Sequence, residues 1–149
     1  ITEYERRKNE AARLIEEMKF KNKVEFVCLD YNQNEYYNAV LNLENLGEKS
    51  IRCYNCYQLR MEKACLYALE KKYDYFTTTL SISPHKNASW INEIGEQLAE
   101  KYNIKYLYAD FKKNDGYKKS LEFSKKYNLY RQEYCGCEFS YLDAKKRYN

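Results

Sequence analysis

Hydrophobic residues recur along this chain at two spacings, one typical of amphipathic helices and one of short buried strands. Near the start, Ala11, Leu14, Ile15 and Met18 repeat at helical spacing beneath a charged face, which predicts a helix over residues 2–19 capped by Thr2. The same spacing predicts further helices at residues 34–46, 53–72, 89–102, 117–127 and 138–148. Short apolar runs rich in β-branched and aromatic residues predict strands at 24–29, 75–80 and 104–108.

Helices that alternate with short apolar strands are typical of an α/β layer fold with a parallel sheet and right-handed crossovers. Gly47 is expected to close the second helix and Ser89 to cap the fourth. At 149 residues, the chain is expected to form a single domain, 1–149. Parallel sheets bind ligands beyond the carboxyl ends of their strands, so the loops at 30–34, 80–87 and 110–116 should meet at one edge, with a cysteine-bearing helix start facing them.

Composition narrows the class of protein. Only 4 Gly and 1 Pro argue against collagenous and linker-rich chains. No apolar run approaches the roughly 20 residues that span a bilayer, and no secretory signal is visible, so a soluble, cytoplasmic protein without a membrane partner is expected. The 26 Lys and Arg, with 18 Tyr and 6 Phe, allow nucleic acid as a partner, although an A/T-rich genome would produce the same composition.

Four of the 6 cysteines fall in two close pairs. Cys53 and Cys56 form a C-x-x-C unit at a predicted helix start, where backbone amides and the helix dipole stabilise thiolates. From this unit alone, half of a metal site, a thioredoxin-like dithiol and coincidence all stay open. In a chain without a signal peptide, the pattern favours metal or redox chemistry over structural disulfides.

Cys135 and Cys137 form a C-x-C unit, and Gly136 between them permits a tight bend. A disulfide across so small a ring would be strained, which suits electron exchange better than stabilisation. The alternative is a zinc site made of all four paired cysteines. Cys28 and Cys65 are expected to be small core residues.

Four segments together resemble the epoxyqueuosine reductases of the QueH type. They are IRCYNCYQLRMEKA (51–64), FTTTLSISPHKN (76–87), INEIGEQLAEKY (91–102) and LYRQEYCGCEFS (129–140), and the resemblance extends from about Glu3 to Ser140. It implies a nucleotide-hydrolase-like (HUP-like) three-layer α/β fold. It also implies a cobalamin-independent iron-sulfur enzyme that reduces epoxyqueuosine to queuosine at the wobble position of tRNA, the last step of queuosine synthesis.

By this resemblance, Cys53 and Cys56 bind a 4Fe-4S cluster as metal ligands, and Cys135 and Cys137 form a redox-active, catalytic disulfide. The family adds an adjacent cysteine pair on a first strand, and no such pair occurs here. This chain is therefore expected to lack that strand, and two further cysteine ligands are expected upstream of Ile1.

The implied partners are a tRNA anticodon stem-loop carrying epoxyqueuosine and an unknown electron donor. Proton donors are expected among His85, Tyr134 and water. Trp90 is expected to pack in the core. The run Thr77, Thr78 and Thr79 is expected either to line a polar pocket or simply to form part of a strand. Candidate backbone contacts to RNA are Arg52, Arg60, Lys86, Lys112, Lys113 and Arg131. Two rival hypotheses are a zinc-bound RNA-binding module and a metal-free thiol oxidoreductase.

Overall fold

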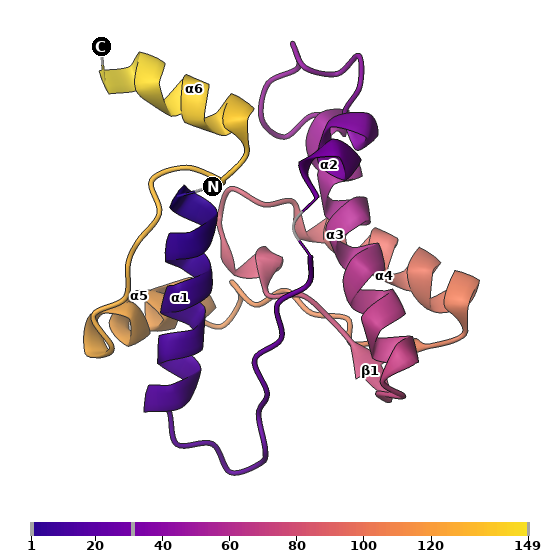
Figure 1. The fold of residues 1–149 in the computed structure, drawn as a ribbon, viewed down its shortest axis with the longest axis vertical. Coiled ribbons are helices and arrows are strands. Elements are labelled where there is room, and N and C mark those ends of the chain that lie inside the picture. Colours follow the sequence, from indigo (N-terminus) through magenta and orange to yellow (C-terminus); the bar gives the residue numbers. More distant parts are fainter. Residues whose placement is uncertain (1, 31, 149) are drawn as a thin grey trace. The chain divides into compact units, whose positions relative to one another are not determined.

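The computed structural model describes residues 2–30 and 32–148, and it divides into two compact units. The central unit comprises Asn32–Ser120, and the terminal unit comprises Ile1–Tyr31 together with Leu121–Asn149. The elements are α1 (Thr2–Glu17), α2 (Gln33–Ala39), α3 (Ile51–Glu70), β1 (Tyr75–Phe76), the 3-10 turn η1 (Leu80–Ile82), α4 (Ala88–Tyr102), β2 (Lys105–Tyr106), α5 (Gly116–Lys126) and α6 (Glu138–Tyr148) (Figure 1). The expectation of a single domain stays a prediction.

The α/β class is confirmed in the central unit. Strands β1 and β2 pair in parallel, with Tyr75 opposite Lys105 and Phe76 opposite Tyr106, and α4 makes the crossover between them. Both strands are shorter than the apolar runs predicted. After Phe76 the Thr77 hydroxyl donates to the Leu107 carbonyl at 2.9 Å, and the chain then turns into η1.

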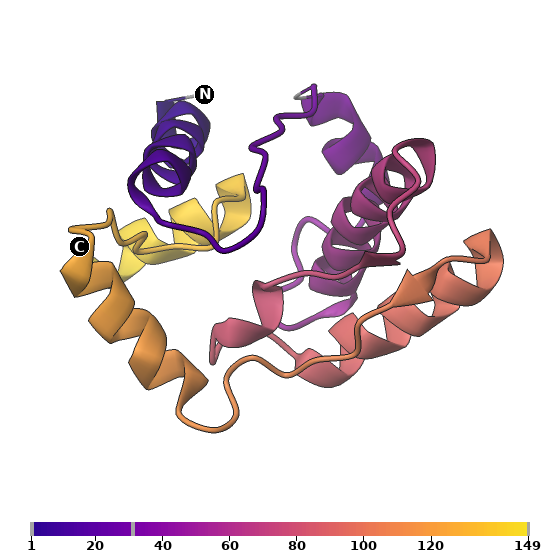
Figure 2. The same ribbon diagram turned by 90° about the horizontal axis from the view of Figure 1, so that it is seen from below.

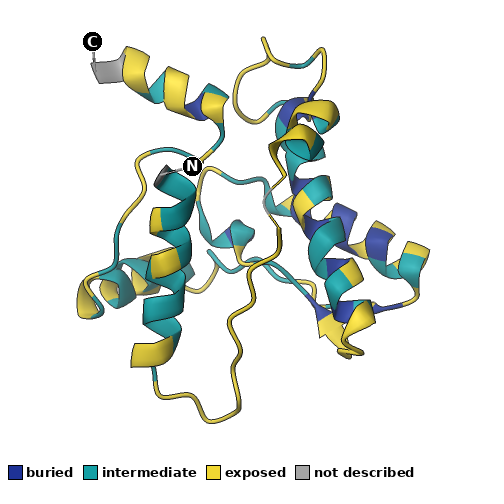
Figure 3. Cartoon of the chain, viewed as in Figure 1, coloured by how far each residue is buried: buried dark blue, intermediate teal, exposed yellow. Residues whose placement is uncertain are grey.

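The prediction of a strand at residues 24–29 is wrong. This segment is irregular, and Figure 3 draws it as exposed throughout. Val24, Phe26, Val27 and Leu29 are 41–45% exposed. A run that is apolar on both faces forms a strand only where neighbours pair its backbone and cover both faces, and no strand pairs with it in the described part of the chain.

The core lies between α3, α4 and the short sheet, and α3 and α4 run side by side in Figures 1 and 2. The buried apolar residues of the described chain all fall between Val40 and Ile104. Burying a side chain such as Met61, Ile91 or Ile94 contributes about 1.5–3 kcal/mol. The predicted apolar stripes of both helices are confirmed as their inner faces; they are Tyr57, Met61, Cys65 and Ala68 on α3, and Ile91, Ile94 and Leu98 on α4.

Helix ends differ from the sequence-based expectations where side chains bind backbone amides. Asn87, not Ser89, caps α4, because its Oδ1 accepts the amides of Ser89 at 3.0 Å and Trp90 at 3.2 Å. The second helix ends at Ala39, well before Gly47. The Thr2 side chain lies outside the described residues. No helix in the described ranges is long and apolar enough to cross a membrane.

Substituting Gly95 with alanine is expected to destabilise the protein. A Cβ at this buried position of α4 would lie 2.3 Å from Cζ of Tyr106, whose ring packs against Phe76. The overlap is expected to cost about 1–3 kcal/mol, which exceeds the gain of about 1 kcal/mol in helix propensity. Urea unfolding measures the difference, and an unchanged or higher midpoint would contradict this packing.

Candidate functional site

The carboxyl edge of the sheet gathers several polar segments of the central unit. Helix α3 ends just before β1, at the amino edge of the sheet, so its first turns lie toward the carboxyl edge. Helix α4 begins after β1 and therefore also starts at the carboxyl edge. The loops expected at 80–87 and 110–116 therefore meet there, as predicted. The third loop, 30–34, includes residue 31, which lies outside the described residues, and no strand precedes it.

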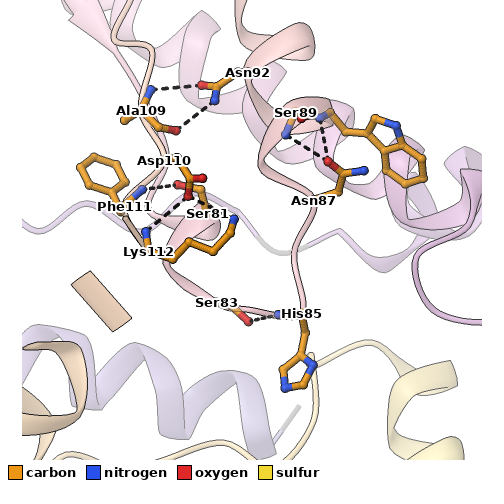
Figure 4. Close-up of polar contacts among 11 residues, drawn as sticks. Ser81, Ser83, His85, Asn87, Ser89, Asn92, Ala109, Asp110, Phe111 and Lys112 are labelled. Carbon is orange, nitrogen blue, oxygen red and sulfur yellow. Dashed lines mark hydrogen bonds and ion pairs between the residues drawn. The ribbon is translucent and has the colours of Figure 1, made fainter. Parts of the chain in front are cut away.

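Ser81 binds these two loops to each other, and Asn92 on α4 binds the residue just before the second loop (Figure 4). The Asn92 amide donates to the Ala109 carbonyl and accepts the Ala109 amide, each at 3.1 Å, and its Oδ1 also accepts the Tyr106 hydroxyl at 3.0 Å. Ser81 Oγ accepts the Phe111 amide at 3.1 Å. Asn92 and Ser81 are both buried, so the edge is held by polar groups that water does not reach.

Cys53 and Cys56 lie in the first two turns of α3, one helical turn apart, and both are half-buried. Their spacing places the two sulfurs on one face of the helix. The first turn of α3 carries no acidic residue, so the partial positive charge of the helix N-terminus is not cancelled there. Two thiols one helical turn apart fit the requirement of an iron-sulfur cluster for thiolate ligands, and they would supply two of those ligands.

Aromatic side chains surround this helix start. Tyr54, between the cysteines, packs edge-on against Trp90 with ring centroids 5.7 Å apart, and its hydroxyl donates to Glu93 at 3.0 Å. Burial, followed by the Glu93 carboxylate, raises the pKa of Tyr54. Trp90 packs against the core, as expected. The Lys86 ammonium lies 5.6 Å from the centre of the Tyr57 ring, which brings the 80–87 loop next to the residue that follows Cys56 on α3.

The C-x-C unit lies in the terminal unit, where α1 holds the segment that leads to it. Polar side chains on one face of α1 bind backbone and side chains of residues 127–135. Arg13 donates to the Tyr127 carbonyl at 3.1 Å, Glu10 accepts the Tyr130 amide at 2.7 Å, and the Arg6 guanidinium carbon lies 3.5 Å from the centre of the Tyr130 ring. The charged face of α1 thus positions the dithiol segment.

Arg7 binds the C-x-C bend itself. Its Nη1 donates to the Cys135 carbonyl at 3.0 Å and its Nη2 to the Tyr134 carbonyl at 3.1 Å, while Nε donates to Glu3 at 2.7 Å. Gly136 follows with φ +108°, a backbone conformation that favours glycine. The Glu3 carboxylate therefore orients the Arg7 guanidinium, whose planar fork of donors binds the two successive carbonyls.

Alanine at Gly136 is expected to disturb this bend. A Cβ there would lie 2.5 Å from Arg7 Nη1 and would require an unfavourable φ, at an expected cost of about 1–3 kcal/mol. The reduction potential of the Cys135–Cys137 couple, measured by thiol trapping in redox buffers, should shift from the wild-type value. An unchanged potential together with wild-type stability would show that the bend tolerates a side chain.

The two cysteine pairs belong to different units, and all six cysteines are present as thiols. Among the described residues, no group of three or more His, Cys, Asp or Glu side chains is placed to hold a metal ion. Cys65 is buried as expected, and burial raises the pKa of its thiol. The expectation for Cys28 is wrong: it is exposed, and its Sγ lies 2.9 Å from the Tyr4 hydroxyl, because no strand forms around it.

One of the candidate RNA contacts is also wrong. Arg52 is only 3% exposed and donates from Nη1 to the Glu44 carbonyl at 2.8 Å, so it braces the loop before α3. Lys112 forms an ion pair with Asp110 at 3.1 Å. The remaining candidates are exposed or half-buried; they are Arg60, Lys86, Lys113 and Arg131.

Two features of the site were missed by sequence reasoning. The first is the polar face of α1, whose signal was a run of carboxylates and arginines at helical spacing, from Glu3 to Arg13. The second is the position of Cys137 directly before α6, whose signal was the expected start of that helix at Glu138. Both were read as separate features and not as parts of one site.

Fold and site define an α/β protein that carries a cysteine pair on a helix start at the carboxyl edge of its parallel sheet and a second pair at a glycine bend. The sequence matches the family described as "Epoxyqueuosine reductase QueH" over residues 1–143, so the chain belongs to the QueH family. The expectation drawn from the sequence motifs is thereby confirmed.

Several curated relatives carry the name epoxyqueuosine reductase QueH. The chain is 42% identical to that of Streptococcus pyogenes serotype M1 over 140 residues, which cover 93% of this chain and 55% of the relative. It is 37% identical to that of Acinetobacter baylyi over 147 residues, covering 98% of this chain and 66% of the relative. The chain thus spans between about half and two thirds of the length of these two relatives.

Proposed function

We propose that this chain belongs to an epoxyqueuosine reductase, which reduces epoxyqueuosine to queuosine at the wobble position of tRNA in the last step of queuosine biosynthesis. The observation that carries the proposal is the family match over residues 1–143, which includes both cysteine pairs. The HUP-like three-layer architecture is part of the same proposal, because relatives carry that enzyme's name. A cytoplasmic location is also part of it, because tRNA is an intracellular substrate.

The reaction sets the requirements for the site. Removing an epoxide oxygen to leave an alkene consumes two electrons and two protons and releases water. When bound, a 4Fe-4S cluster supplies electrons one at a time, which no ordinary side chain does at the required potential. Cys53 and Cys56 are the ligands that this chain is proposed to contribute, because they lie one helical turn apart at the start of α3, half-buried near aromatic rings.

The C-x-C pair is proposed as the reservoir of reducing equivalents. Oxidation of the Cys135 and Cys137 thiols to a disulfide releases two electrons and two protons, which matches the demand of one turnover. Arg7 holds the bend in which this disulfide would form. An electron donor of unspecified identity then reduces the disulfide again.

Two side chains are candidates for delivering protons. Burial raises the pKa of Tyr134, so its phenol stays protonated at neutral pH, and its ring lies 5.2 Å from that of Tyr141. His85 is exposed in the loop after η1, where its backbone amide donates to Ser83 (Figure 4). Tyr134 directly precedes the dithiol in the sequence, whereas His85 precedes Lys86, whose ammonium lies over the Tyr57 ring of α3.

The substrate is proposed to be a nucleotide of the tRNA anticodon stem-loop. Loop bases can be unstacked and bound on aromatic rings, while the phosphates contact cations. The chain has a formal net charge of +4, and exposed cations such as Arg60, Lys113 and Arg131 are available for that role. Binding of the tRNA should therefore weaken steeply as salt is raised.

The test is turnover by anaerobically purified full-length protein on tRNA that carries epoxyqueuosine, together with analysis of iron and sulfide. Conversion to queuosine with bound iron and sulfide supports the proposal. Zinc without sulfide and no turnover would favour a zinc-bound RNA-binding module made of the four paired cysteines. No metal, with disulfide exchange on protein substrates, would favour a metal-free thiol oxidoreductase.

A further inference from the structure

Helix α5 presents its lysines on one side. Its exposed side chains are Tyr117, Lys118, Lys119, Glu122, Lys125 and Lys126. At about 100° per residue, the four lysines and Glu122 fall within a sector of about 120° of the helix surface, called here the lysine face. Leu121 and Phe123 lie outside this sector and are half-buried, and the Phe123 ring packs against that of Tyr127 with centroids 4.7 Å apart. The lysine face is therefore cationic and carries no large apolar side chain.

This face holds most of the excess positive charge of the chain. Four lysines against one glutamate give α5 a net charge of +3, while the whole chain has a net charge of +4. On α1, in contrast, Arg7, Lys8 and Arg13 each form an ion pair with a glutamate of the same helix. None of the four lysines of α5 forms an ion pair within the described part of the chain. A single carboxylate, that of Glu122, could offset only one of them.

Helix stability accounts for only half of the lysine face. The two lysines of the last turn interact favourably with the negative end of the helix dipole. Lys118 and Lys119 lie in the first turn, where the dipole opposes a positive charge and no residue is acidic. The Lys119 ammonium donates to the Asn114 carbonyl at 3.1 Å, which leaves its charge without a counter-ion. The pair in the first turn therefore indicates an anionic partner outside the helix.

We propose that the lysine face binds the sugar-phosphate backbone of tRNA, outside the modified nucleotide. Lysine is a point charge on a flexible stem, so neighbouring lysines contact phosphates without reading the base sequence. The first-turn pair and the last-turn pair are seven residues apart, about 10 Å along the helix axis, and they therefore reach different phosphates. The identity of the RNA rests on the function proposed above.

The side chains of the face favour RNA over an anionic membrane. A helix that lies on a membrane inserts large apolar side chains beside its cations. On α5 the half-buried Leu121 and Phe123 are turned away from the lysines, and Tyr117 is the single exposed ring within Gly116–Lys126, all of which is described. Phosphate contacts need the cations alone.

The test removes the charge of the face in the full-length protein. The variants are Lys118→Gln/Lys119→Gln, Lys125→Gln/Lys126→Gln and the combination of all four. Glutamine keeps a long polar side chain and forms helices about as well as lysine, so α5 is expected to stay folded, which circular dichroism checks. The matched control is Lys71→Gln/Lys72→Gln, which also removes two neighbouring exposed lysines, directly after α3.

Binding is measured for tRNA that carries epoxyqueuosine and for an unmodified transcript of the same tRNA, over a range of salt concentrations. At about 150 mM salt, the Kd of the fourfold variant is expected to rise at least about tenfold. The slope of log Kd against log salt concentration should become shallower by about 3, which is close to 0.7–0.9 for each lost phosphate contact. Each double variant should show about half of this change. Both RNAs should lose affinity by the same factor, and the control variant should keep the wild-type slope.

Unchanged affinity and slope in the fourfold variant would overturn the assignment. An equal loss in the control variant would also overturn it, because net charge and not this face would then govern binding. Vesicles that contain phosphatidylserine test the membrane as the other occupant. If the four lysines were needed for vesicle binding and not for tRNA binding, the face would belong to a membrane contact and the assignment would be wrong.

Turnover separates this inference from the proposed function. If the protein did not reduce epoxyqueuosine but the fourfold variant bound tRNA more weakly with a shallower slope, the RNA surface would stand and the proposed function would be wrong. If every variant reduced epoxyqueuosine with the wild-type KM for tRNA and the wild-type Kd, the function would stand and the surface would be wrong.

Discussion

Replacing Cys53 or Cys56 with serine is expected to lower turnover of epoxyqueuosine-tRNA by at least about 100-fold, with loss of bound iron and sulfide. A serine hydroxyl is protonated at neutral pH and is a poor ligand for iron. Each substitution removes one of the two cysteines of α3 that are proposed as cluster ligands. Loss of the absorption band near 400 nm and iron analysis of the purified variants give a readout that does not depend on turnover.

Cys28→Ser is the matched control for this experiment. Cys28 is also a thiol outside the core, and it lies in the terminal unit, away from α3 in the sequence. Wild-type iron content and turnover are expected for it. If Cys53→Ser or Cys56→Ser retained full iron content and turnover while folding normally, these two residues would not be cluster ligands and the proposed site would be wrong.

Replacing Asn92 with alanine is expected to cause a large loss of stability. The side chain is 2% exposed and serves the Ala109 amide, the Ala109 carbonyl and the Tyr106 hydroxyl. Each buried polar group left without a partner costs about 1–3 kcal/mol, and partial relaxation limits the total to about 3–5 kcal/mol. Urea unfolding measures this, and turnover should fall as well because the 107–112 loop loses its attachment to α4.

Asn55→Ala is a useful comparison for Asn92. Asn55 is half-buried on α3 and donates a single hydrogen bond, to the Ala39 carbonyl at 2.9 Å. Its loss should cost only about 0.5–1.5 kcal/mol. Similar losses for the two variants would mean that the network around Asn92 contributes no more than one ordinary hydrogen bond.

The helices could be predicted from the sequence because each carries its own local pattern. Residues such as Met61 and Leu98 recur at helical spacing on faces that are in fact buried. Strands were less predictable, because a strand depends on partners that are distant in sequence. The apolar run at 24–29 looks like a strand by composition, yet nothing in the described chain pairs with it.

In the candidate site too, local features could be predicted from the sequence and long-range contacts could not. The position of Cys53 and Cys56 on a helix start followed from their local sequence, and the structure begins α3 at Ile51. The function of α1 could not be foreseen, because a stripe such as Arg7, Glu10 and Arg13 looks like any solvated helix face until its long-range partners are known. The Arg52 side chain was misjudged for the same reason: its partner is a backbone carbonyl, which a sequence motif does not reveal.

The bond from Arg7 to the Cys135 carbonyl joins residues 128 positions apart. Closing so long a loop costs chain entropy before any contact is made, so this bond belongs to the slow, non-local part of folding. During synthesis the dithiol bend cannot take its final shape until Cys135 has emerged and returned to a helix made much earlier. Cys53, Cys56 and Cys65 are therefore synthesised, and can begin to fold with α3, before the bend at Cys135 and Cys137 can form.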